Sequence, residues 1–453
     1  MKELKKSRLD SFLINPPKAL WTLAIPVMAG MGIQTLYSIV DMIFIGRLGG
    51  DSIAAVAFNM PLFFLVLGLT MGLGSGVTAS VARYIGAKDK KNADNSAEHA
   101  ILIGLAISVV LTTFGFLYGQ EMLILLGATE SIVDLSWSYL KIICFGLPFM
   151  VFSAFFRSIL AGEGDMKFPM MVAGLGTVLN IIFDPIFIFT LNLGVAGAAV
   201  ATVISQLIVF AVFVYMLFFK DHAYITFNLK DFTFSKSLLG EIIKIGLPAS
   251  MSMVIMATGQ AVFNKILIYY NAESVAAYQV AGRLDMLVFL PIMAIAYGLT
   301  TLVGMFFGAK ETDKLKEIVK YGITRSVLIT IITSTLVYIF APILIRTFTP
   351  EPIIQSIAIQ YLRIMAFAYP FVAVGMTSGR IMQGLGKGLP MLVITVIRVL
   401  LVSSLLSLYF AIELNKPVEY VWYAMVIATF ISASISLTWV RSVFIKIVNP
   451  LEN

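Results

Sequence analysis

The sequence predicts an all-α, polytopic membrane protein in which 12 transmembrane helices form two pseudo-symmetric six-helix lobes around a central cavity. The first reason is composition. Of 453 residues, 59% are hydrophobic and only 13% are charged, and the mean hydropathy is +0.94, far from the balance of soluble domains. The second reason is an internal repeat that aligns the two halves of the chain.

Twelve apolar stretches reach about 20 residues or more, the length that spans a bilayer. Several are longer, so tilted, kinked or projecting helices are expected. The expected spans are 18–45, 54–85, 98–118, 135–158, 168–190, 195–219, 241–269, 276–307, 319–345, 357–381, 389–411 and 418–446.

Lysines and arginines concentrate in the loops that would share one side of the membrane. By the positive-inside rule this predicts a multi-pass protein of the cell (plasma) membrane with cytoplasmic N- and C-termini. The net charge of +7 does not indicate nucleic-acid binding, because the basic residues form no continuous face. One cysteine and two histidines are too few for a zinc or redox site, so no cofactor is expected.

One constant shift in residue number, which we call the repeat register, aligns Pro26 with Pro248 and Thr78 with Thr300, and it holds over many helices. The polar stretch 220–237 is the best linker between the halves. We therefore expect an N-lobe over 1–219 and a C-lobe over 238–453. Because each repeat has an even number of spans, the lobes should share one orientation in the membrane.

Two acids lie where hydrocarbon is expected. Asp41 ends a polar stripe at helical spacing that begins at Gln34, and Asp184 lies in a later span. In the repeat register Asp41 aligns with Phe263, and with a one-residue slip Asp184 aligns with Leu405. The acids are therefore an addition to one lobe, and ionisable groups at membrane depth are candidates for ion or proton handling.

Helix direction places both acids at one depth with an amide and a hydroxyl. Such a chamber suits Na⁺, through oxygen ligands, or one or two protons. Pro26 and Gly30 loosen the first helix, which predicts a hinge there. The expected ion-binding residues are Asp41, Asn180, Asp184 and Thr202.

The motifs Ala24-Ile25-Pro26, Tyr37-Ser38-Ile39-Val40-Asp41 and Asn180-Ile181-Ile182-Phe183-Asp184-Pro185 resemble those of MATE (multidrug and toxic compound extrusion) transporters. The resemblance covers nearly the whole chain. Within the family, the chain is similar to an archaeal member of the DinF-like branch. It implies export of small, amphipathic, often cationic drugs by antiport. It also implies substrate contacts in the N-lobe or the central cavity, for which the candidates are Met31, Gln34, Tyr37, Thr177 and Asn180.

Two other functions compete with antiport. A flippase for lipid-linked sugars or lipids has a similar two-lobe architecture, but it needs several basic residues in the cavity. An intramembrane aspartyl protease would need a second motif in another helix, so no enzyme activity is expected. The chain is expected to be monomeric. The intramembrane charges of the second half, Lys265, Arg283, Asp285 and Arg398, could snorkel, line the cavity or pair with one another, and pairing is the favoured expectation.

Overall fold

The computed structural model describes residues 7–228 and 232–448, apart from the side chains of residues 36–39, 131, 447 and 448. These residues form helices, π-helical segments and short connections, and within them there is no strand. In chain order the elements are α1 (Leu9–Ile14), α2 (Pro16–Gly46), α3 (Gly50–Gly86), α4 (Lys90–Leu125), α5 (Glu130–Gly162), α6 (Lys167–Pro185), η1 (Ile186–Thr190), α7 (Gly194–Val214), η2 (Tyr215–Phe219), α8 (Lys236–Tyr270), α9 (Ala272–Gly308), α10 (Thr312–Arg346), α11 (Pro352–Met365), α12 (Tyr369–Gly384), α13 (Leu389–Val396), η3 (Ile397–Ser404), α14 (Leu405–Leu408), η4 (Tyr409–Glu413), α15 (Glu419–Val443) and η5 (Phe444–Val448).

Among the described residues, 11 helices are long and apolar enough to cross a membrane, or up to 12 if one bent pair is a single span. The bent pair occupies the span expected over 357–381: α11 and α12 meet at 58°. Pro370 permits the break, because it has no N–H with which to continue the helix. The carbonyl of Ala368 accepts hydrogen bonds from the backbone N–H groups of Phe371 and Val372. These bonds form the first turn of a new helix, α12.

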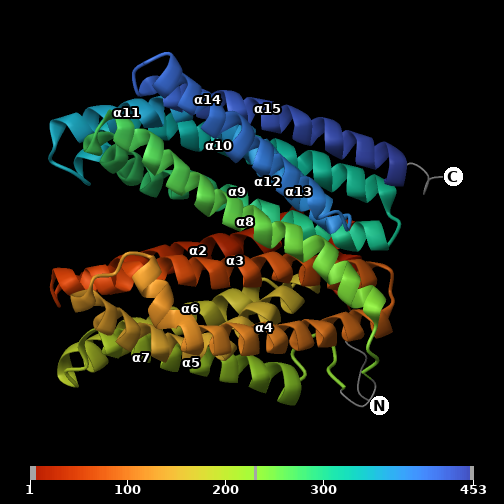
Figure 1. Ribbon diagram of the computed structural model, residues 1–453. Helices are drawn as coiled ribbons and strands as arrows, with labels where there is room; N and C mark the ends of the chain where they lie inside the picture. Colours follow the sequence, from red (N-terminus) through yellow and green to blue (C-terminus); the bar gives the residue numbers. More distant parts are fainter. Residues whose placement is uncertain (1–6, 229–231, 449–453) are drawn as a thin grey trace. The chain divides into compact units, whose positions relative to one another are not determined.

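The chain divides into two compact units (Figure 1). The first consists of Met1–Arg8 and Ile25–Ile242, and the second of Leu9–Ala24 and Ile243–Asn453. Each helix that opens a repeat therefore belongs to both units: the boundary falls inside α2, one residue before Pro26, and inside α8. These boundaries differ from the expected lobes at the beginning of each repeat.

Within the first unit α5 packs against α3, α4 and α7, and within the second α9 packs against α10, α11 and α12. The repeat is visible in single hydrogen bonds. The hydroxyl of Thr78 donates to the carbonyl of Ser158 at 2.9 Å, and that of Thr300 donates to the carbonyl of Arg380 at 3.4 Å. Both donors and both acceptors align in the repeat register, so the two units share one packing scheme.

Glycines close the same contact in each unit. A Cβ atom added at Gly162 would lie 2.8 Å from the Cβ atom of Val81, and one added at Gly384 would lie 2.9 Å from that of Val303. Real side chains do not approach so closely, so each glycine is required by helix packing rather than by flexibility.

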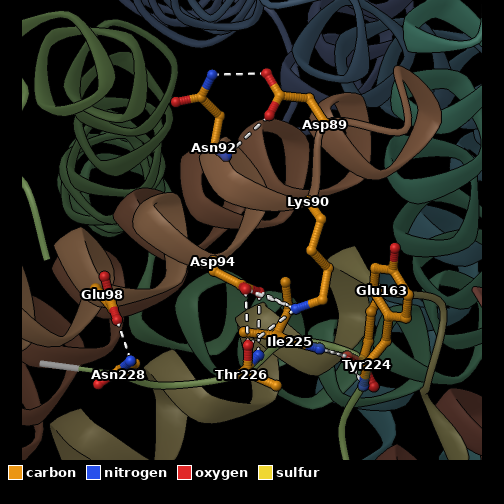
Figure 2. A network of polar contacts seen from close by, with 10 residues as sticks. All are labelled: Asp89, Lys90, Asn92, Asp94, Glu98, Glu163, Tyr224, Ile225, Thr226 and Asn228. Carbon is orange, nitrogen blue, oxygen red and sulfur yellow. Dashed lines mark hydrogen bonds and ion pairs between the residues drawn. The ribbon is translucent and has the colours of Figure 1, made fainter. Parts of the chain in front are cut away.

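The segment after η2 runs along the ends of α4 and α5 as a strap, here meaning residues 221–228 (Figure 2). The buried carboxylate of Glu163 accepts from the backbone N–H groups of Tyr224 at 2.8 Å and Ile225 at 3.2 Å. Asp94 accepts from the backbone N–H of Thr226 at 3.0 Å. Carboxylates thus satisfy backbone donors that no sheet or helix could satisfy here.

Asp165 anchors the beginning of the chain to the same region. Its carboxylate accepts from the Arg8 guanidinium at 2.9 Å and lies 3.2 Å from His222 Nε2. Backbone and side-chain hydrogen bonds, together with the Arg8 charge, outweigh burial and lower the pKa of Asp165. This carboxyl group therefore stays ionised.

The pKa of Glu163 is shifted in the opposite direction, so the hydrogen bonds that it accepts should depend on pH. Burial raises its pKa from 4.5 to about 7, so between these values the folded protein keeps a proton that the unfolded chain releases. Since an ionised carboxylate is the stronger acceptor, amide hydrogen exchange at Tyr224 and Ile225, corrected for its intrinsic rate, should slow as the pH rises through about 7.

Hydrogen exchange measured by mass spectrometry from pH 5 to 9 checks this (a range of about two units either side of the expected pKa). Glu163→Gln should remove the step, whereas Glu317→Gln, at an exposed acid, should retain it. An unchanged step in Glu163→Gln would show that another group controls the strap.

Candidate functional site

Asp184 and Asn180 form the centre of the site on α6. The side chain of Asp184 is fully buried, and its Oδ1 accepts from Asn180 Nδ2 at 3.0 Å. The spacing of four residues places both side chains on one helical face. Asp184 Oδ2 is also buried but has no hydrogen-bond partner among the described residues. A buried carboxylate oxygen without a partner is costly, and a proton or a cation would satisfy it.

Asp41, on α2, brings a second carboxyl group close enough to interact electrostatically with Asp184. Two carboxylates accept hydrogen bonds but do not donate them, so a direct hydrogen bond between these two groups would need one of them to be protonated. Tyr139, on α5, lies within electrostatic range of both acids. The site therefore draws on three helices of the first unit.

The backbone widens directly after the acid. Pro185 ends α6, and the chain continues as the π-helix η1, in which Leu191 N–H donates to the Ile186 carbonyl at 2.9 Å. Such segments often mark functional sites. Gly197 of α7 faces the turn, and a Cβ atom there would lie 2.5 Å from the Phe187 carbonyl oxygen. The glycine is therefore needed for α7 to approach the segment that follows Asp184.

The other predicted site residues are less closely placed. Thr202 is half-buried on α7 and makes no hydrogen bond to either acid in the described part of the chain. Met31 and Thr177 are half-buried, Gln34 is exposed, and the side chain of Tyr37 lies outside the described residues. The roles of these residues stay predictions.

The expected hinge lies in an unbroken helix. Pro26 sits inside α2, two residues after the end of the part that belongs to the second unit. Gly30 lies against α6, where an added Cβ atom would come within 2.6 Å of the Met170 sulfur. The absence of a side chain at Gly30 thus lets α2 approach the helix that carries Asp184.

The second unit holds a buried acid whose partners the sequence did not indicate. Asp285 was expected to pair with a basic residue, and this is wrong: among the described residues it has no ion pair. It instead accepts hydrogen bonds from the hydroxyls of Tyr361, at 2.7 Å, and Tyr369. Tyr361 lies on α11 and Tyr369 on α12, so Asp285 joins the two halves of the bent span.

The repeat contained a signal for these tyrosines. Tyr361 aligns with Tyr139 in the repeat register, and each lies near an acid of its own unit. Tyr369 aligns with Leu147, in the unbroken helix α5. An aromatic hydroxyl beside a buried acid is therefore part of the shared scaffold, whereas the second hydroxyl accompanies the bend.

The MatE family model matches residues 26–186 and 248–408. The chain belongs to this family. The two matched segments begin and end at positions that align in the repeat register, so the family model itself follows the internal repeat. The family is one of multidrug efflux transporters, so this MatE protein is a multi-pass membrane transporter and not an enzyme.

Related proteins cover nearly the whole chain. A probable multidrug resistance protein NorM of Thermotoga maritima is 28% identical over 386 residues, which is 84% of this chain and 83% of that protein. Crystal structures of MATE in the straight and in the bent conformation each share 32% identity and a TM-score of 0.93, and cover 99% of this chain and 100% of theirs.

The Asp285 cluster generates a stability prediction. Asp285→Asn leaves one good acceptor for two hydroxyls that are nearly or fully buried, and an unsatisfied buried group costs about 1–3 kcal/mol. The melting temperature of the purified protein, followed by loss of its gel-filtration peak, should fall by several degrees.

Tyr361→Phe and Tyr369→Phe should each lower it less, since each removes one hydrogen bond and its donor together. Asp313→Asn, at an exposed acid of the same unit, serves as the control. A wild-type melting temperature in Asp285→Asn would rule out this role.

Proposed function

We propose that this MatE protein is a secondary active multidrug efflux antiporter, which exports amphipathic, often cationic organic compounds in exchange for H⁺ or Na⁺. The family assignment supports the export. The observation that carries the coupling is the pair formed by Asp41 and the fully buried Asp184, whose Oδ2 has no partner among the described residues. The coupling ion is a transported substrate, and no cofactor is needed.

The acid pair has the properties of an ion site. Two negative charges about 4 Å apart repel by about 4 kcal/mol at an effective dielectric constant of 20, and by more in a drier site. One proton removes that repulsion, and a Na⁺ ion between the carboxylates replaces it with attraction. Asn180 adds an amide near Asp184, and Thr202 is proposed to add a hydroxyl. Sodium prefers such oxygen ligands, as other hard cations do.

Loading of the pair is proposed to move α2. Asp41 lies on this helix, and Asp184 lies on α6, so a change of charge alters the force between the two helices. Pro26 and Gly30 supply the hinge that permits bending. Related MATE structures are described as bent and straight, which supports a helix or lobe with two arrangements. Substrate is proposed to contact Met31, Gln34, Tyr37, Thr177 and Asn180, so that bending displaces it.

We also propose how the protein lies in the membrane and how its chain is divided. The distribution of basic residues supports cytoplasmic termini, and we place the protein in the DinF-like branch as a monomer. The N-lobe of the transport cycle is the first repeat, 1–219, and the C-lobe is 238–453, joined by the linker 220–237.

Neutralising either acid should stop coupled export. Asp41→Asn and Asp184→Asn each remove the ionisable group from the pair, so gradient-driven export of a fluorescent cationic dye from proteoliposomes should be abolished while the gel-filtration profile is kept. Asp134→Asn, at an exposed acid, is the matched control. Wild-type export by both variants would overturn the assignment of the ion site.

The identity of the ion follows from separated gradients. In proteoliposomes given a proton gradient alone or a sodium gradient alone, export should follow one of them and be lost when that gradient is collapsed. Export that responds to neither gradient would argue against antiport.

A further inference from the structure

A cluster of hydrogen-bond donors lies in the second unit, away from the Asp285 site. Arg380 of α12 is only 8% exposed, and its guanidinium carbon stands 4.3 Å from the ring centre of Tyr297 on α9. Arg380 Nη1 donates to Gln383 Oε1 at 3.1 Å. We call these three residues, Tyr297, Arg380 and Gln383, the donor cluster.

The donor cluster contains too few acceptors. A guanidinium offers five N–H donors, and in the described chain the only hydrogen bond from the Arg380 side chain is the one to Gln383. The Tyr297 hydroxyl is buried, and no described residue is its partner. The Gln383 amide donates to the sulfur of Met391, and a thioether is a weak acceptor. Three neighbouring side chains thus carry N–H or O–H donors that have no strong acceptor among the described residues.

The charge is also unbalanced. No carboxylate of the described residues lies within ion-pair distance of Arg380. The Tyr297 ring and the nearby end of α12, at Gly384, stabilise a cation in part. A water molecule would accept hydrogen bonds, but it would not neutralise the charge. A buried arginine is normally paired, and an anion would supply the charge that is needed here.

The internal repeat shows that the shared scaffold does not require these side chains. In the repeat register, Tyr297, Arg380 and Gln383 align with Ser75, Ser158 and Ala161. Ser75 and Ser158 satisfy themselves on carbonyls of their own helices, Gly72 and Ala154, at 2.6 and 2.9 Å.

The backbone at Ser158 and at Arg380, which align in the repeat register, is nevertheless held in the same way. The carbonyls of Ser158 and Arg380 each accept from the aligned threonine of the neighbouring helix. Three large polar side chains have thus been placed in one unit on a frame that small residues complete in the other. This pattern is typical of a binding function rather than of packing.

We propose that the donor cluster is a subsite for the anionic group of an amphiphile, a carboxylate or a phosphate. A planar guanidinium binds either group through two parallel hydrogen bonds, and the Tyr297 hydroxyl supplies a third donor. The subsite rests on the proposed export function and refines its substrate class: zwitterionic and anionic amphiphiles are included beside cationic ones. Because Arg380 is 8% exposed, ligand entry requires a conformation in which α12 is uncovered.

A matched pair of dyes tests the subsite. Rhodamine 110 carries a free carboxylate, and rhodamine 123 is its methyl ester without an anionic group. Binding of each to the purified full-length protein is measured by fluorescence anisotropy. Arg380→Gln should weaken rhodamine 110 binding by about tenfold, the loss expected for a charge-assisted pair, and should change rhodamine 123 binding by less than about twofold.

Three further variants separate binding from structure. Arg380→Lys keeps the charge but not the paired donors, so it should fall between wild type and Arg380→Gln. Tyr297→Phe keeps the ring and removes the hydroxyl, and should weaken rhodamine 110 alone by a few-fold. Arg325→Gln is the control, because Arg325 also stands over a tyrosine ring of this unit, 5.0 Å from the ring centre of Tyr321, but is exposed.

The two sources of the anion are distinguished with dihexanoyl phosphatidic acid as a competitor. Displacement of rhodamine 110 from the wild type and not from Arg380→Gln assigns a lipid phosphate to the subsite as well, and absence of displacement confines it to substrate carboxylates. Equal losses for both dyes, no loss for either, or no binding of rhodamine 110 to the wild type would overturn the proposal. Binding needs no gradient, so a failure of coupled export would leave this result interpretable.

Discussion

The contact between Asp41 and Asp184 is the constraint on which the first unit depends. Hydrocarbon does not solvate a carboxylate, so two acids at membrane depth must be enclosed by protein, and the proposed proton or cation would offset their repulsion. The nearby structure includes the amide of Asn180, the π-helix after Pro185, and Gly30 and Gly197, which let α2 and α7 approach the segments before and after Asp184. Burial of the two acids therefore costs free energy, and tightly packed helices surround them.

The sequence predicted the membrane-spanning helices well, because the length of an apolar stretch and the spacing of a repeat can both be read along the chain without knowing which residues touch. It did not predict the bend after Met365. Pro148 and Pro370 are equivalent in the repeat, yet α5 runs through Pro148 unbroken. The difference lies in tertiary contacts, since Tyr369 reaches Asp285 and its counterpart Leu147 cannot. A proline permits a break, and the neighbouring partners decide whether it forms.

The candidate site shows the same limit. Helical spacing indicated that Asn180 and Asp184 share a face, but it could not identify Tyr139, which comes from a helix distant in sequence. Asp285 was assigned a basic partner because opposite charges usually meet in membranes, whereas two tyrosine hydroxyls satisfy it. Arg380 lies next to the end of its expected span, where basic residues are common, so the sequence does not distinguish it. Partner choice depends on three-dimensional geometry, and the pattern along the chain contains little of it.

The position of the unit boundaries has a consequence for the origin of the molecule. The opening turns of α2 belong to the second unit, and Lys236–Ile242 of α8 belongs to the first. The first helix of each repeat therefore begins in the unit formed mainly by the other repeat. A single-repeat ancestor that assembled in this way would have been a domain-swapped homodimer. Fusion of two such chains would need only a connection between them, and each copy could then acquire polar residues of its own.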